Sequence, residues 1–134
     1  MAVRVAFEKC DLKELPWPSF PRGACGDVSL VLGQVLDDEG IDGFMYVCGH
    51  KYSESGAVSS HAWLQNGDWV VDITADQFED VDDAVIVSNC STWHDEWKRD
   101  HPTAGTLRQY GCQVPQLWRV LSKLELEFDS SRNP

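Results

Sequence analysis

The sequence of 134 residues predicts a single α+β domain. Three observations lead to this prediction: a helix-periodic run that begins at Cys25, β-type segments in the middle of the chain, and a second helix-periodic run near the C-terminus. A chain of this length buries about two-thirds of its unfolded surface, which is enough for one core. No internal repeat or low-complexity linker divides it. We therefore expect one domain over residues 1–128 and a disordered tail over residues 129–134.

The first predicted helix starts at Cys25. Its apolar residues recur at spacings of three and four, which is typical of one buried helix face. Gly40 is expected just beyond its C-terminus, where a residue of positive φ ends many helices. The apolar residues of this face are Val28, Val31, Leu32, Val35 and Leu36.

Four segments are predicted to be strands. Residues 44–48 form the first, and residues 59–65 and 68–74 form a hairpin after a polar loop at residues 53–59. Residues 84–87 are entirely apolar, so we expect a strand that is central or covered on both faces. The remaining chain predicts one short helix within residues 89–106 and a longer one over residues 114–126, with Pro115 in its first turn.

The hairpin has a strong turn signal in Asn66-Gly67, because a two-residue type I′ turn needs positive φ at both central positions. That turn pairs Leu64 with Trp69 and places His61 directly opposite Asp72. Directly opposed side chains point to the same face of a sheet. The sequence therefore predicts an imidazole beside a carboxylate.

Composition excludes several classes of function. The net charge of −11 does not favour nucleic acid or an anionic membrane surface, since both attract Lys and Arg clusters. The N-terminus lacks the apolar core of a signal peptide, and no segment has the length of a membrane span. Five cysteines without an export signal indicate free thiols and a cytoplasmic protein.

Cys25, His61 and Asp72 form the predicted catalytic set. A cysteine at a helix N-terminus next to an imidazolium has a lowered pKa and is the nucleophile of many hydrolases. His61 is the candidate base, and Asp72 would hold its ring in the right tautomer. The competing interpretation is a small buried Cys and an ordinary cross-strand polar pair. Asp76 is the substitute for Asp72 if the register differs.

At these residues the chain resembles the transglutaminase-like branch of the papain-like cysteine hydrolases, including the small leader peptidases of lasso-peptide biosynthesis. The resembling segments are Gly23-Ala24-Cys25-Gly26-Asp27-Val28-Ser29, His61-Ala62-Trp63, and residues 69–78 from Trp69 to Phe78. The resemblance implies a catalytic helix packed on a small antiparallel sheet, and Cys25, His61 and Asp72 as a triad. It also implies a thioester intermediate, a peptide or protein substrate, and no cofactor or metal.

The acyl acceptor stays open at this point. Hydrolysis of an amide by a peptidase or amidase is the favoured reading, and the alternatives are acyl transfer of the transglutaminase type and glutamine deamidation. Papain-like enzymes carry a Gln or Asn before the Cys as an oxyanion donor, and this chain has none there. An inactive interaction module of the same fold is therefore a further alternative. Candidates for substrate contact or oxyanion stabilisation are Trp17, Ser19, Arg22, Trp63 and Gln77.

A second candidate feature is a zinc site, for which the sequence offers Cys90, His94, His101 and Cys112. None of the pairs has the close Cys-Cys spacing of structural zinc sites. We therefore expect core packing or solvent exposure for these residues, with His94 as a possible lining residue of the catalytic cleft. His50 and His101 are expected to face solvent.

Overall fold

The computed structural model describes Arg4 and residues 24–132. Within this part the chain has three α-helices and one antiparallel sheet of six strands, so the α+β prediction is confirmed. The elements are α2 (Cys25–Asp38), β1 (Met45–Tyr52), β2 (Val58–Asn66), β3 (Trp69–Asp72), η1 (Ala75–Gln77), β4 (Ile86–Ser88), α3 (Thr92–Asp95), β5 (Lys98–Arg99), β6 (Thr103–Ala104), η2 (Leu107–Gln113) and α4 (Pro115–Arg132).

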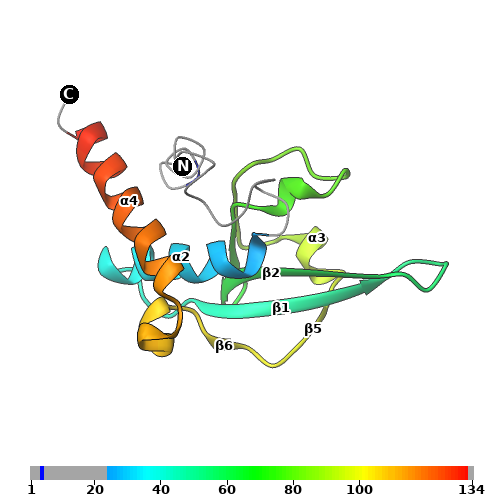
Figure 1. Cartoon of the computed structure of the whole chain (residues 1–134). Helices are drawn as coiled ribbons and strands as arrows, with labels where there is room; N and C mark the ends of the chain where they lie inside the picture. Colours follow the sequence, from blue (N-terminus) through cyan, green and yellow to red (C-terminus); the bar gives the residue numbers. More distant parts are fainter. Residues whose placement is uncertain (1–3, 5–23, 133–134) are drawn as a thin grey trace.

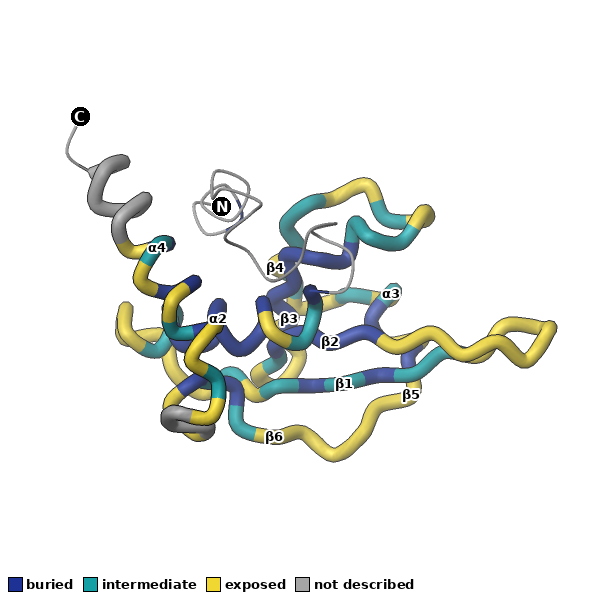
Figure 2. Tube along the Cα trace, in the orientation of Figure 1, coloured by how far each residue is buried: buried dark blue, intermediate teal, exposed yellow. Residues whose placement is uncertain are grey.

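The sheet has the order β4-β3-β2-β1-β5, and β6 also pairs with β1. Helix α2 lies along β1 and β2, and α4 packs against α2 (Figure 1). The centre of the sheet is buried, whereas the loop between β1 and β2 is exposed (Figure 2). The predicted helices at residues 25–36 and 114–126 and the short helix within residues 89–106 are all present.

Alternate residues of the central strands enter two separate cores, as the two-residue period of a strand requires. Leu64 and Val71 face the core that α2 and α4 cover. Trp63 and Val70 face the opposite side, where they pack with Val47 and Trp97. The sheet is therefore covered on both faces.

Helix α2 packs so closely against the backbone at Gly105 that Gly33 has no room for a side chain. A Cβ at this position would lie 1.7 Å from the carbonyl oxygen of Gly105. At the end of the helix, Glu39 is the C-cap residue and Gly40 has a φ of 85°, as the sequence predicts. The left-handed conformation of Gly40 is the usual stop for a helix.

Gly33→Ala is expected to destabilise the domain by about 3 kcal/mol, because the contact at Gly33 involves backbone atoms that cannot rotate away. The better helix propensity of Ala, about 1 kcal/mol, does not offset this overlap. Urea denaturation measures the change. Ser122→Ala on the exposed face of α4 is the control and should stay within about 0.5 kcal/mol of wild type. Equal stabilities for the two variants would contradict this packing.

The predicted register of the hairpin is wrong by two residues. Asn66 pairs with Trp69 and Leu64 pairs with Val71, so the turn residues are Gly67 and Asp68. Gly67 has a φ of 59°, and among the described residues positive φ occurs only at glycines. This fits a type II′ turn, which needs positive φ at its first central position only. A shift of two residues keeps every side chain on its predicted face, whereas a shift of one would reverse it.

Two other predictions are wrong. Strand β4 lies at the edge of the sheet, and Val87 is 56% exposed. Only part of this apolar run is covered: Val85 packs against the core, whereas Val87 faces solvent. The expected disordered tail is also wrong for residues 129–132, which continue α4. Glu125, Leu126 and Glu127 before them favour helix, so nothing ends α4 at residue 128. Residues 133–134 lie outside the described part.

The helices of the described residues include none with both the length and the apolarity needed to cross a bilayer.

Candidate active site

Cys25 is the first residue of α2, with its side chain half-buried. The preceding residue, Ala24, is buried and offers no capping side chain to the helix. The N–H groups of a first helical turn have no partner within the helix, so they are available to an anion beside them. Asp27 in the same turn is exposed.

Strand β3 ends at Asp72 and does not pair with the first half of β2. This leaves space beside β2 for the N-terminus of α2. The last residue pair between β2 and β3 is Leu64 with Val71, while β2 extends back to Val58. In the part of β2 that pairs with β1 but not with β3, the backbone of Ala62 hydrogen-bonds the Cys25 thiol. The Ser29 hydroxyl donates to the carbonyl of Cys25 within α2 at 2.6 Å and lies 3.4 Å from the carbonyl oxygen of Ala62 in β2. The start of α2 is thus held against β2 next to His61.

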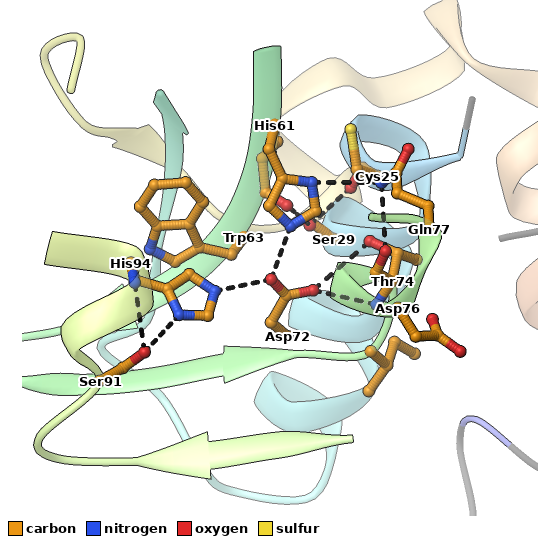
Figure 3. Close-up of polar contacts among 12 residues, drawn as sticks. Cys25, Ser29, His61, Trp63, Asp72, Thr74, Asp76, Gln77, Ser91 and His94 are labelled. Carbon is orange, nitrogen blue, oxygen red and sulfur yellow. Dashed lines mark hydrogen bonds and ion pairs between the residues drawn. The ribbon is translucent and has the colours of Figure 1, made fainter. Parts of the chain in front are cut away.

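His61 lies between Cys25 and Asp72 (Figure 3). Its Nε2 is 2.6 Å from Oδ2 of Asp72, and the two side chains are 0% and 1% exposed. The ring also hydrogen-bonds the Cys25 thiol, and Nδ1 is the nitrogen left for that bond. The register shift explains the geometry, because it makes His61 and Asp72 diagonal neighbours on one face instead of directly opposed residues.

The electrostatics of this arrangement favour a charged pair. Burial raises the pKa of the Cys25 thiol, but the hydrogen bond and the positive charge of His61 outweigh it and the pKa ends below its usual value. Burial lowers the pKa of His61, but the bonds to Asp72 and Cys25 raise it to about 9. Burial also acts against ionised Asp72, yet its hydrogen bonds with His61 and His94 hold the pKa of the carboxyl well below its ordinary range. The arrangement therefore favours the thiolate of Cys25 and the imidazolium of His61 over the neutral pair.

Asp72 has a second imidazole partner that the sequence analysis did not assign to it. Nε2 of His94, in α3, is 2.7 Å from the same Oδ2 atom, and His94 is 0% exposed. The other oxygen of Asp72 accepts from the backbone N–H of Thr74 at 2.9 Å. The sequence did carry a signal, because Ser91 is a helix N-cap residue and the third residue after it often turns its side chain back to the cap. That residue is His94.

Among the other predicted residues that the structure describes, Gln77 lies next to the triad. Its Nε2 is 3.2 Å from Nδ1 of His61, and it donates to the carbonyl of Thr74 at 3.1 Å. Asp76 does not substitute for Asp72, since the guanidinium of Arg4 binds both its oxygens at 2.8 and 2.9 Å.

Trp63 does not fit its predicted role as a substrate contact or oxyanion donor. Its side chain is 0% exposed, and its indole N–H donates to Gln65 at 2.9 Å. It packs beneath the site, with its ring 4.9 Å from that of His94. The predicted candidates Trp17, Ser19 and Arg22 lie outside the described residues.

Two clusters in the described part of the chain bring together side chains of the kinds that bind metals. His61, Asp72 and His94 form the buried one, but their nitrogen and oxygen atoms already hydrogen-bond each other. The second is Cys48, His50 and Asp100, with 3.7 Å between Nδ1 of His50 and Oδ1 of Asp100. Asp100 is exposed, and His50, expected to face solvent, is half-buried with 34% of its side chain exposed. His101 is exposed as expected.

A depression of about 590 Å³ adjoins the site on the side of α3. Trp93 lines it, and the Trp93 ring lies 5.7 Å from that of His61. Trp93 therefore separates the imidazole from this depression. The wall includes acidic and apolar residues: Asp80, Asp82, Asp83, Val85 and Ile86.

Comparisons of the chain with protein families, with curated proteins and with solved structures gave no match. The geometry of Cys25, His61 and Asp72 is therefore the basis for assigning a function.

Proposed function

We propose that this protein is a cysteine-dependent amide hydrolase, a peptidase or amidase that forms a thioester on Cys25. The observation that carries the proposal is the position of His61, which hydrogen-bonds the thiol on one side and Asp72 on the other. A nucleophile, a base and a group that orients the base are the three parts that this chemistry needs.

In the proposed reaction, the Cys25 thiolate attacks the carbonyl carbon of the amide. The tetrahedral intermediate collapses, the C–N bond breaks, and Nδ1–H of His61 donates its proton to the leaving amine. A water molecule then attacks the thioester while His61 takes up its proton, and the carboxylic acid leaves as Cys25 is restored. Asp72 keeps Nε2 protonated throughout, so that Nδ1 is the nitrogen that exchanges protons.

Two donor groups act at different stages of this cycle. The backbone of Gly26 hydrogen-bonds the Cys25 thiol, as expected of the first turn of a helix. The Gln77 amide can donate to Nδ1 of His61 only when that nitrogen carries no proton. Gln77 thus stabilises the neutral ring after His61 has protonated the leaving group.

A transglutaminase-like or papain-like fold is part of the same proposal. A helix that starts with the nucleophile, and packs on an antiparallel sheet bearing His61 and Asp72, agrees with that architecture. We expect a peptide or protein substrate and no cofactor. The free thiols of Cys25, Cys48 and Cys90 agree with a cytoplasmic location.

The test is selective alkylation. At pH 6, iodoacetamide is expected to modify Cys25 at least about tenfold faster than Cys48 or Cys90, because a thiolate reacts and a thiol does not. Burial and the negative charge of Asp100 raise the pKa of Cys48, which makes it a suitable internal reference. Peptide mass spectrometry of the alkylated protein gives the rates. Equal rates for all thiols would leave the inactive interaction module as the better description.

The acceptor is decided by incubation with an acyl-activated peptide probe. A covalent adduct on Cys25 that disappears in water indicates hydrolysis. An adduct that is lost only when a primary amine is added indicates the acyltransferase alternative, and release of ammonia from a glutamine peptide indicates deamidation. A Cys25→Ala variant should form no adduct in any of the three cases.

A further inference from the structure

We infer that His94 is a positioning residue of the active site, which donates its Nε2–H to Asp72 and thereby limits how tightly Asp72 holds the proton of His61. This inference rests on the proposed function, since it assigns a role within the same Cys25-His61-Asp72 set. It adds a member that sits on α3, far from the other three in the sequence.

The proton on His94 can be placed from its hydrogen bonds. Ser91 caps α3, and its hydroxyl oxygen accepts from the backbone N–H of His94 at 3.4 Å. The same hydroxyl lies 2.5 Å from Nδ1 of His94 and has its own hydrogen left to donate. Nδ1 is then the acceptor, which leaves the ring hydrogen on Nε2, facing Asp72 at 2.7 Å. Every polar atom of this buried ring is satisfied in that tautomer.

The two imidazoles bind the same oxygen atom of Asp72, at 2.6 Å for His61 and 2.7 Å for His94. Hydrogen bonds to a carboxylate compete for its charge, so a donor from His94 weakens the attraction of Asp72 for the His61 proton. Thr74 binds the other oxygen through its backbone N–H and so holds the carboxylate in place independently. The removal of His94 should therefore strengthen the Asp72–His61 bond instead of releasing Asp72.

Among the contacts of the charged and titratable groups around His61, the one between His94 and Asp72 is the one that the experiment changes. From α2 comes Cys25, from β3 comes Asp72, and from α3 comes His94. Other faces of the ring meet Trp63, Phe78, Trp93 and Trp97, which carry no charge. Of the more distant ions, Arg99 pairs with Asp95 and the carbonyl of His94, and Arg4 pairs with Asp76. Asp80 accepts from the indole N–H of Trp93 and lines the depression together with Asp82 and Asp83.

The experiment compares His94→Leu with His94→Gln. Leu has a similar size and no donor, whereas the amide nitrogen of Gln can occupy the position of Nε2 and donate to Asp72. The measurement is the pH dependence of Cys25 alkylation by iodoacetate, whose negative charge is attracted by the imidazolium. In wild type the rate should fall as His61 loses its proton, with a midpoint near its pKa of about 9.

His94→Leu is expected to raise this alkaline midpoint by about one pH unit, and His94→Gln is expected to leave it near the wild-type value. A residue that only packs the core would change the folded fraction, seen by circular dichroism, and not the midpoint. An unchanged or lowered midpoint in folded His94→Leu would overturn the inference. So would equal shifts in the Leu and Gln variants.

A second measurement does not depend on Cys25. Imidazole ¹⁵N spectra of the full chain at pH 7 should show His94 with a hydrogen on Nε2 and none on Nδ1. The opposite tautomer in wild type would overturn the inference even if His94→Leu fails to fold. If Cys25 is not selectively alkylated, the proposed function fails, whereas the tautomer still tests the contact between His94 and Asp72.

Discussion

His61→Ala is expected to slow the alkylation of Cys25 at pH 6 by about 10- to 100-fold. Without the imidazolium, burial raises the pKa of the thiol and only the backbone hydrogen bonds of Ala62 and Gly26 still act to lower it. An ordinary cysteine with a pKa of about 8.5 is only a few parts per thousand thiolate at pH 6. Thiolates of low pKa are weaker nucleophiles, which offsets part of this difference. The rate is measured with iodoacetamide, followed by mass spectrometry of the Cys25 peptide.

His50→Ala is the matched control, because it removes an imidazole from the neighbouring strand that does not bond Cys25. It should leave the alkylation rate unchanged within about twofold. His61 is buried among aromatic rings, so its removal leaves a cavity, and the folded fraction must be checked by circular dichroism. A folded His61→Ala protein that reacts as fast as wild type would show that Cys25 and His61 do not act together.

Asp72→Ala is expected to have the largest effect on stability, about 3–5 kcal/mol at pH 6. The carboxylate is 2% exposed and accepts hydrogen bonds from His61, His94 and Thr74. Its removal leaves a buried imidazolium without its counter-charge and several donors without an acceptor. Urea denaturation measures the loss. Asp95→Ala, which removes an exposed partner of Arg99, should change stability by less than about 1 kcal/mol.

The stability difference between wild type and Asp72→Ala should depend on pH in a defined way. The pKa of His61 is raised to about 9, so its contribution is complete below the unfolded value of about 6.5 and is lost as the pH rises towards 9. The pKa of Asp72 is lowered, so its contribution is complete above about 4 and is lost at lower pH. The difference should therefore be largest between about pH 4 and 6.5. A constant difference from pH 4 to 9 would contradict the ion pair.

The hairpin register predicted from the sequence is wrong, but the pair of site residues predicted from it, His61 and Asp72, is in contact. Asn66-Gly67 indicates a tight turn, and the turn is present one residue later, at Gly67 and Asp68. Because the error shifts the pairing by an even number of residues, His61 and Asp72 stay on one face. Long side chains reach a diagonal neighbour as well as a direct one, so the hydrogen bond forms.

The parts of this protein that depend on local periodicity can be predicted from the sequence. The run of apolar residues after Cys25 defines α2, Gly40 ends it, and the alternation in β2 directs His61 and Trp63 to one face. These features follow from the 3.6-residue and two-residue periods of helix and strand, which are visible within a short window.

The tertiary structure alone decided the contacts between distant segments. The early end of β3 lets the start of α2 reach β2, and α3 folds back so that His94 shares an oxygen of Asp72 with His61. The same holds for the edge position of β4 and the ion pair of Arg4 with Asp76. No local pattern encodes these contacts, because each depends on which surfaces remain available once the sheet and helices have packed.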